Sequence, residues 1–284
     1  MFIVADSGST KTHWTIIAKD KITESFQTQG LNPYFVNEEM ITKEIVENFP
    51  QEINPQHIQT VYFYGAGCKV KQTRQVILNG CSVFFSQAQI IIETDLLGAA
   101  RALFADQEGL VSILGTGANT GIYNGRHISR QIPSLGFALG DEGSGAHLGK
   151  LLVIDYLHQQ LPDDLSTLFE RNFSISRDEI IYSVYKKPTP SKFLANFAPF
   201  IHRHRGHPHI QQIIQRSFQS LFENYICKYP DYKKYALGFA GSIAHSFKAE
   251  LEIKAHENGL SIVQIIKDPM KKLAEFHLEA EKKK

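Results

Sequence analysis

A short polar turn near the start of the chain combines the residue types that bind phosphate. Asp6 follows the apolar run of residues 2–5, and the turn continues through Ser7, Gly8, Ser9, Thr10 and Lys11. Hydroxyls and backbone N–H groups can donate to phosphate oxygens, glycine permits close approach, and a carboxylate can hold Mg²⁺ directly or through its waters. The pattern predicts a phosphate-binding turn, although an ordinary polar hairpin has the same composition.

A second glycine-rich turn occurs about a hundred residues later in the same local setting. Residues 115–119, with sequence GTGAN, lie between the apolar runs 110–114 and 120–123. Two such turns in one chain indicate an internal duplication and a second phosphate site. A dinucleotide-binding fingerprint would have to open a helix here, whereas an Asn-Gly turn follows. A Walker loop is also excluded, because the glycine spacing at 145–150 is wrong and Leu151 replaces its Ser or Thr.

Carboxylates and small residues mark further positions where predicted strands meet other elements. Asp95 precedes a helical pattern and could accept the proton of an attacking hydroxyl or simply cap the helix. Asp141 and Glu142, between glycines, suit sugar hydroxyls and Mg²⁺ waters or a plain loop. Gly241 and Ser242 could let adenine or ribose lie against the backbone, or form a standard strand-to-helix turn.

The elements that must position these residues alternate between strands and helices. Strand patterns cover residues 2–5, 12–18, 60–64, 88–92, 110–114, 120–123 and 234–240, and helical patterns cover 96–104, 213–227, 243–252 and 273–280. This alternation predicts an α/β fold with a mixed sheet in each of two lobes. We expect an N-terminal lobe at 1–107, joined by the C-terminal helix 268–284, and a larger, helix-rich lobe at 108–267.

Composition narrows the classes of partner. The chain has 284 residues, and its 30 basic and 29 acidic side chains create no global field for nucleic acid or an anionic membrane. No apolar run or leader pattern predicts a membrane span or secretion signal, and Cys68, Cys81 and Cys227 are too scattered for a disulfide framework. We expect a cytoplasmic protein. The histidine-rich segment 202–209 is predicted to be a solvated loop, because its arginines would repel a metal ion.

Taken together, the motifs resemble the actin, hexokinase and heat-shock-chaperone ATPase superfamily. Within it, the chain is similar to the N-acetylglucosamine kinase-like members of the BadF/BadG-type ATPase family. The resemblance spans most of the chain and is strongest at residues 6–11, 94–95, 115–119 and 140–144. It implies a two-lobed ribonuclease H-like, actin-like ATPase fold with a central cleft. It also implies ATP and Mg²⁺ as cofactors, a small sugar as substrate, and a possible homodimer.

The resemblance also implies a role for each candidate residue. Asp95 would be the catalytic base, and Asp6 and Asp141 would organise Mg²⁺. The nucleotide would contact Ser7, Gly8, Ser9, Thr10, Lys11, Gly115, Thr116, Gly117, Gly241 and Ser242. The sugar would contact Asn32, Thr94, Asp95, Asn119, Gly136, Asp141 and Glu142. Two positions depart from the family pattern: Ala240 replaces a glycine, and residues 268–272 replace a Gly-Ala segment.

The implied activity is ATP-dependent phosphorylation of an amino sugar, N-acetylglucosamine to N-acetylglucosamine 6-phosphate. Two alternatives remain open at this point. One is a BadF-type activator ATPase that drives electron transfer from a shared iron–sulfur cluster, for which the cysteines are poorly placed. The other is a nucleotide- or sugar-binding regulator without turnover.

Overall fold

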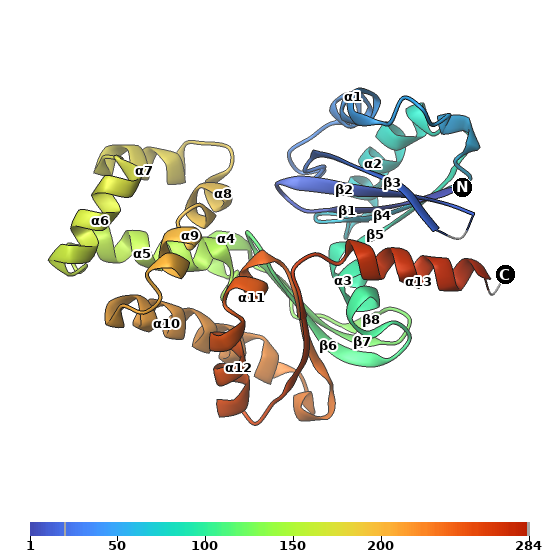
Figure 1. Cartoon of the computed structure of the whole chain (residues 1–284). Helices are drawn as coiled ribbons and strands as arrows, with labels where there is room; N and C mark the ends of the chain where they lie inside the picture. The colour runs from blue at the N-terminus through green and yellow to red at the C-terminus, as the bar shows by residue number, and fades with distance from the viewer. Residues whose placement is uncertain (20, 283–284) are drawn as a thin grey trace. The chain divides into compact units, whose positions relative to one another are not determined.

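The computed structural model describes residues 1–19 and 21–282, and it divides the chain into two compact units (Figure 1). Unit 1 contains residues 1–107, the short segment 123–128 and the C-terminal segment from Asp268. Unit 2 contains residues 108–122 and 129–267. Each unit has its own five-stranded sheet and its own hydrophobic core.

The sheet of unit 1 has the strand order β3-β2-β1-β4-β5. Its strands are β1 (Phe2–Ser7), β2 (Lys11–Ala18), β3 (Lys21–Gln29), β4 (Thr60–Gly65) and β5 (Gln89–Thr94). The first strand pairs antiparallel with β2 and parallel with β4, which in turn pairs parallel with β5. Because the carboxyl ends of parallel strands meet at one edge of a sheet, the segments after β1, β4 and β5 lie at the same edge.

The two faces of this sheet differ in polarity. Alternation along the strands places Ala5, Trp14 and Phe63 in the apolar core. The neighbouring residues Asp6, His13 and Tyr64 lie side by side in register, on the opposite face. Helices α1 (Glu38–Asn48) and α2 (Lys71–Phe84) cover the apolar face, and α3 (Asp95–Phe104) and α13 (Met270–Lys282) cover the polar face (Figure 1).

The sheet of unit 2 repeats the same order, with β10-β9-β6-β7-β8. Its strands are β6 (Glu108–Leu114), β7 (Ala118–Asn124), β8 (Ile128–Arg130), β9 (Leu237–Ala240) and β10 (Ile262–Ile266). In both sheets the first strand is central, with the second and third strands on one side and the fourth and fifth on the other. The prediction of an α/β fold with duplicated mixed sheets is therefore confirmed.

Helices make up most of the remainder of unit 2. They are α4 (Gly136–Leu139), α5 (Gly145–Leu157), α6 (Asp163–Phe173), α7 (Arg177–Tyr185), α8 (Pro190–Ala195), α9 (Ala198–Arg203), α10 (Pro208–Asn224), α11 (Ser242–Ser246) and α12 (Lys248–Glu257). Local chemistry sets several of their starts. Ser176 and Glu179 form a capping box before α7, and Pro208 occupies the first turn of α10.

Several boundaries differ from those expected. The strand predicted at 234–240 is only Leu237–Ala240, because the 3₁₀ turn Tyr232–Lys234 precedes it. The helix predicted at 243–252 is two helices, interrupted at the fully buried Phe247. The one predicted at 213–227 begins earlier, at Pro208, and ends at Asn224. The sequence patterns did not reveal α1, α2, β3, β8 or β10.

The histidine-rich segment 202–209 is a solvated loop only in part, because just residues 204–207 form a partly exposed turn. Residues up to Arg203 belong to α9, and α10 begins at Pro208. His207 Nε2 lies 3.4 Å from Asp164 Oδ2, and His209 Nε2 lies 3.0 Å from the buried Asp155 Oδ2. These histidines therefore link α10 to α5 and α6.

All three cysteines carry free thiols, with Cys68 and Cys81 buried. Among the described helices, none combines the length and the apolar character that a membrane span requires.

Candidate active site

The turn between β1 and β2 presents four of its residues outward and one inward. Gly8 N donates to Lys11 O at 3.0 Å and closes the turn, and residues 8–11 are exposed. Ser7, by contrast, is only 1% exposed. Its hydroxyl lies 2.8 Å from Thr12 Oγ1 and accepts from Leu31 N at 3.1 Å. Ser7 thus holds the base of the turn in this structure, while Gly8 to Lys11 face outward.

A glycine that the sequence analysis did not single out supports this turn. Gly30 N donates to Thr10 O at 3.1 Å, and a Cβ at Gly30 would lie 2.5 Å from Gly8 O. Only glycine permits this close backbone approach. Two residues later, Asn32 is 8% exposed, and its Oδ1 accepts from Tyr34 N at 3.1 Å.

The loop after β4 packs against Asn32. A Cβ on Gly67, whose φ is +81°, would lie 2.6 Å from Asn32 Oδ1. Because β4 is the parallel neighbour of β1, this loop begins beside the Asp6 turn, and Ala66 N donates to Ser7 O at 2.9 Å. Asn32 therefore belongs to the same sheet edge as Asp6.

Asp6 lies in a negative environment within unit 1. Burial, and secondarily repulsion from Asp268 and Asp95, raises the pKa of Asp6 to about 7, although His13 and Lys11 act in the opposite direction. His13 Nδ1 lies 2.6 Å from Asp268 Oδ2. Burial acts to raise the pKa of Asp268, but its hydrogen bonds with His13 and Met270 N outweigh that effect and lower it. A divalent cation fits beside Asp6, because it would offset this accumulated negative charge.

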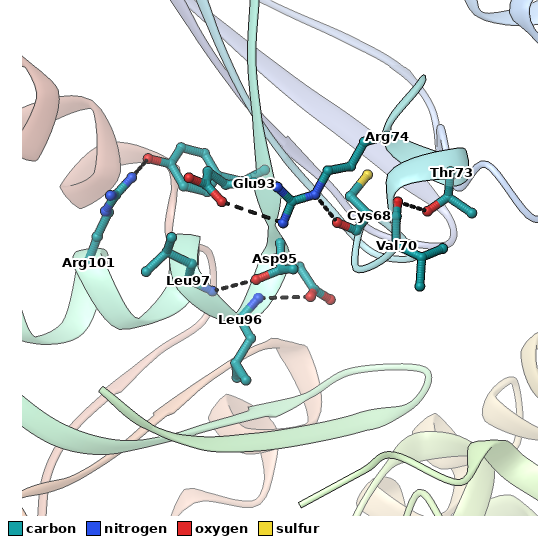
Figure 2. Close-up of polar contacts among 11 residues, drawn as sticks. Cys68, Val70, Thr73, Arg74, Glu93, Asp95, Leu96, Leu97 and Arg101 are labelled. Carbon is teal, nitrogen blue, oxygen red and sulfur yellow. Dashed lines mark hydrogen bonds and ion pairs between the residues drawn. The ribbon is translucent and has the colours of Figure 1, made fainter. Parts of the chain in front are cut away.

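Asp95 is the first residue of α3, and the capping of this helix orients it. Thr94 is the N-cap, with its Oγ1 accepting from Leu97 N at 3.3 Å, while Asp95 Oδ1 accepts from Leu96 N at 2.8 Å (Figure 2). Burial raises the pKa of Asp95 to about 6, although its backbone hydrogen bonds act to lower it. A carboxylate with this pKa is mostly ionised at neutral pH and is still basic enough to take a proton.

Arg74 on α2 fixes the loop beside Asp95. Its Nε donates to Cys68 O at 2.8 Å, and its Nη2 lies 3.8 Å from Glu93 Oε2 on β5 (Figure 2). Burial, and secondarily the charge of Asp95, raises the pKa of the Cys68 thiol to about 12. Cys68 is therefore an uncharged neighbour of the carboxylate at physiological pH.

The second glycine turn, in unit 2, is held by the start of α5. Gly115 N donates to Gly117 O at 3.0 Å, Gly145 N donates to Gly115 O at 2.9 Å, and Ala146 N donates to Thr116 O at 3.0 Å. A Cβ at Gly115 would meet no atom within 4 Å, so the turn is open on that side. A Cβ at Gly117 would instead lie 2.9 Å from Asp141 Oδ2.

Asp141 ties this turn to the segment before α5. It is 7% exposed, and its Oδ1 accepts from Ala118 N at 3.3 Å and from Ser134 Oγ at 3.2 Å. Burial raises its pKa, and these hydrogen bonds act in the opposite direction. The next residue, Glu142, is anchored to the end of α10, because its Oε1 accepts from Asn224 Nδ2 at 3.1 Å.

The remaining predicted residues of unit 2 all follow this turn in the chain. Asn119, which was expected in the turn, is on β7, where its Oδ1 accepts from Gln131 Nε2 at 2.7 Å. Gly136 has a φ of +72° and open space where a Cβ would be. Gly241 has a φ of +116°, and a Cβ there would lie 2.3 Å from Leu114 O, so packing against the end of β6 requires glycine. Ser242 is exposed at the start of α11.

The candidates thus form two groups. Unit 1 brings together the Asp6 turn, Asn32, Thr94 and Asp95, and unit 2 brings together the Gly115 turn, Asp141 and Gly241. Within residues 1–19 and 21–282, no three or more His, Cys, Asp or Glu side chains cluster as a metal site.

Comparison with known proteins gives the same class of fold. Neither a family model nor a curated protein sequence matches the chain. Among solved structures, a provisionally assigned N-acetylglucosamine kinase from Porphyromonas gingivalis is 35% identical, with 99% of this chain and 100% of that chain covered and a TM-score of 0.93.

Two more distant structures agree in fold alone. A provisionally assigned N-acetylglucosamine kinase from Chromobacterium violaceum is 16% identical over 97% of this chain and 99% of that one, with a TM-score of 0.73. A ROK family glucokinase from Streptomyces griseus, in complex with glucose and AMPPNP, is 11% identical over 97% of each chain, with a TM-score of 0.57.

The duplicated sheets and their glycine turns define an actin-like ATPase fold. The full-length match at 35% identity shows the family: the chain belongs to the N-acetylglucosamine kinase-like proteins. This membership makes it a phosphotransferase of the sugar kinase class. The resemblance inferred from the motifs is confirmed at that level.

Proposed function

We propose that this chain uses ATP to phosphorylate an amino sugar, converting N-acetylglucosamine to N-acetylglucosamine 6-phosphate. The observation that carries the proposal is Asp95, a partly buried carboxylate with a pKa of about 6 at the first turn of α3. It lies at the same sheet edge as the turn that contains Asp6. The match to the P. gingivalis protein supports an amino sugar as the substrate class.

In the proposed reaction, Asp95 accepts the proton of the sugar hydroxyl as that oxygen forms a bond to the γ-phosphorus. The bond between the γ-phosphorus and the β–γ bridging oxygen breaks, and ADP leaves. Alignment of hydroxyl and phosphate can lower the barrier by about 7 to 11 kcal/mol. General-base catalysis typically adds about a hundred- to ten-thousand-fold.

Both units carry residues that we propose for nucleotide and sugar binding. The nucleotide phosphates would contact residues 8–11 and 115–117, and the adenosine would contact Gly241 and Ser242. The open space at Gly115 and the exposure of residues 8–11 support these roles. The proposed sugar contacts are Asn32, Thr94, Asn119, Gly136, Asp141 and Glu142.

Asp6 is the proposed Mg²⁺ residue, with Asp141 as a second candidate. The negative surroundings of Asp6 support this role. Asp141 comes second because it is buried and already accepts two hydrogen bonds. When bound, the ion would neutralise charge on the phosphates.

The test is an assay of ADP release with MgATP and a panel of sugars: N-acetylglucosamine, glucosamine, N-acetylmannosamine, N-acetylmuramate and glucose. We expect N-acetylglucosamine to give the highest kcat/KM and Asp95→Asn to abolish most of that turnover. A preference for another sugar would refute the assigned substrate. ATP binding without sugar-dependent ADP release would favour the regulator without turnover.

The thiols do not favour the activator ATPase as a second function. A cluster shared by two identical subunits needs two well-placed thiolates from each subunit, whereas Cys68 and Cys81 are buried in unit 1. Cys227 lies in unit 2, apart from the other two cysteines in the fold. Three free thiols do suit a reducing compartment, so we propose that the protein acts in the cytoplasm.

A further inference from the structure

Tyr64 contacts both elements that carry the proposed catalytic carboxylates. On β4 it is the in-register neighbour of Asp6, on the polar face of the sheet, and it is 1% exposed. Its ring also packs against α3, because a Cβ built on Gly98 would lie 2.9 Å from the Cγ and Cδ1 atoms of Tyr64. Gly98 is three residues, or about one helical turn, after Asp95.

The hydroxyl of Tyr64 connects α3 with the C-terminal helix. Arg101 Nη1, on α3, donates to Tyr64 Oη at 2.5 Å (Figure 2), and His277 Nε2, on α13, lies 2.7 Å from the same oxygen. A guanidinium group only donates hydrogen bonds, so the tyrosine oxygen accepts from Arg101 and can give its own proton to His277. His277 is 3% exposed, so this bridge is shielded from water.

The residues of α3 that face the sheet explain why this bridge can control the position of the helix. Half of its buried residues are small, namely Gly98, Ala99, Ala100 and Ala102, and Gly98 is the one that faces the Tyr64 ring. Small side chains interlock weakly, and the large ring opposite them therefore decides how closely the helix approaches the sheet. Burial raises the pKa of Tyr64 to about 12, so its hydroxyl keeps its proton at physiological pH.

We propose that Tyr64 is a positioning residue that sets the place of α3, and so of Asp95, relative to β1 and Asp6, with Arg101 and His277 holding its ring in that place. The catalytic part of this inference rests on the proposed function. A displacement of about 1 Å at a reacting group can cost roughly a hundredfold in rate. The C-terminal helix would then support catalysis without touching the substrate.

The kinetic test uses Tyr64→Phe and His277→Leu, which remove the polar bridge but retain apolar volume. We expect kcat to fall about tenfold, with KM for ATP within about twofold, because binding groups are untouched. Gly98→Ala should have a larger effect, because its Cβ must displace either the ring or the helix. In an Asp95→Asn background, Tyr64→Phe should cause no further loss of kcat. An equal further loss there would refute the positioning role and indicate only a lower amount of active protein.

Glu281→Gln is the matched control. Glu281 lies one turn after His277 on α13, and its Oε1 accepts from the hydroxyl of Tyr62 at 2.8 Å. The substitution therefore weakens a tyrosine contact of the same helix without removing the Tyr64 bridge. We expect its kcat to remain within about twofold of the wild type.

Amide hydrogen exchange gives a readout that does not depend on activity. In Tyr64→Phe the amides of Leu96 and Leu97 should exchange about tenfold faster or more, whereas Glu281→Gln should leave them unchanged. Unchanged exchange in Tyr64→Phe would overturn the inference. If Asp95→Asn retained full turnover while exchange responded as expected, the assigned base would be wrong and the structural part of the inference would stand.

Discussion

The sheets of units 1 and 2 share one strand order, but equivalent positions in them carry different chemistry. The turn after the first strand of unit 1 follows Asp6 and ends in Lys11, whereas the equivalent turn of unit 2, at Gly115 to Gly117, has no charged residue. The fifth strand of unit 1 leads directly to Asp95 and α3. The fifth strand of unit 2 leads to Asp268 and α13, which pack in unit 1.

The two units also differ in how they accommodate their buried carboxylates. In unit 1, burial raises the pKa of Asp6 to about 7, with a smaller contribution from repulsion by Asp268 and Asp95. In unit 2, the buried Asp141 instead accepts hydrogen bonds from Ala118 N and Ser134 Oγ. Unfavourable electrostatics of the kind seen in unit 1 persist mainly where function needs them.

The largest difference should appear in kcat when the two carboxylates that follow the fifth strand of each sheet are replaced. Asp95→Asn should lower kcat about a hundred- to ten-thousand-fold with ATP affinity nearly unchanged, because it removes the proposed base. Asp268→Asn should lower kcat by less than about tenfold, because Asp268 already bonds His13 and Met270 N. Steady-state kinetics and nucleotide titration measure both. Equal losses in the two variants would contradict the assignment of Asp95.

The second comparison is between two glycines of one turn. Gly115→Ala should leave the free energy of unfolding nearly unchanged and raise KM for ATP about tenfold, because its methyl group enters open space proposed for phosphate. Gly117→Ala should destabilise the protein by about 1 to 3 kcal/mol, because its methyl group meets the Asp141 carboxylate. Urea unfolding and the KM for ATP separate the two effects. An unchanged KM in Gly115→Ala would remove this turn from the nucleotide site.

The pH dependence of turnover tests the proposed role of Asp95 in unit 1. Burial raises the pKa of Asp95 to about 6, and only the ionised carboxylate can accept a proton. At saturating MgATP and sugar, where the bound ion would keep Asp6 ionised, kcat should therefore fall about tenfold per pH unit below about pH 6 and level off above it. Turnover measured from pH 5 to 8 tests this limb. A profile that is flat through pH 6 would contradict a carboxylate base with this pKa.

The smallest expected effect is on stability. The pKa of Asp6 is raised from 3.8 to about 7, so its folded-state contribution is most favourable below about pH 4 and is lost as pH rises through about 7. Asp6→Asn should therefore weaken the decline in stability across this window and make the protein more stable than the wild type at pH 7, while impairing turnover. Urea unfolding at pH 4.5 and pH 7.5 measures the difference. Parallel pH dependence in the two proteins would contradict the raised pKa.

Much of the fold and part of the site could be predicted because their signals are local. Strand patterns in the sequence predicted most strands of both sheets, and helical patterns predicted α3 and α13. Thr94 was available as the helix cap that the structure shows. Among the elements missed, α1 and β3 are mostly exposed, so their formation depends on packing against the rest of the unit. The functional roles assigned to the site residues remain predictions.

The sequence by itself determined the α/β alternation, the two glycine turns and the carboxylate at the start of α3, because strand period, turn chemistry and helix capping involve residues close together in the chain. Only the tertiary structure decided that Ser7 faces inward and that Asp268 and His13 pair beside Asp6. It alone brought His277 to Tyr64 across 213 positions of sequence. Such contacts depend on which strands become neighbours and which helix returns to which face, and no local pattern records that choice.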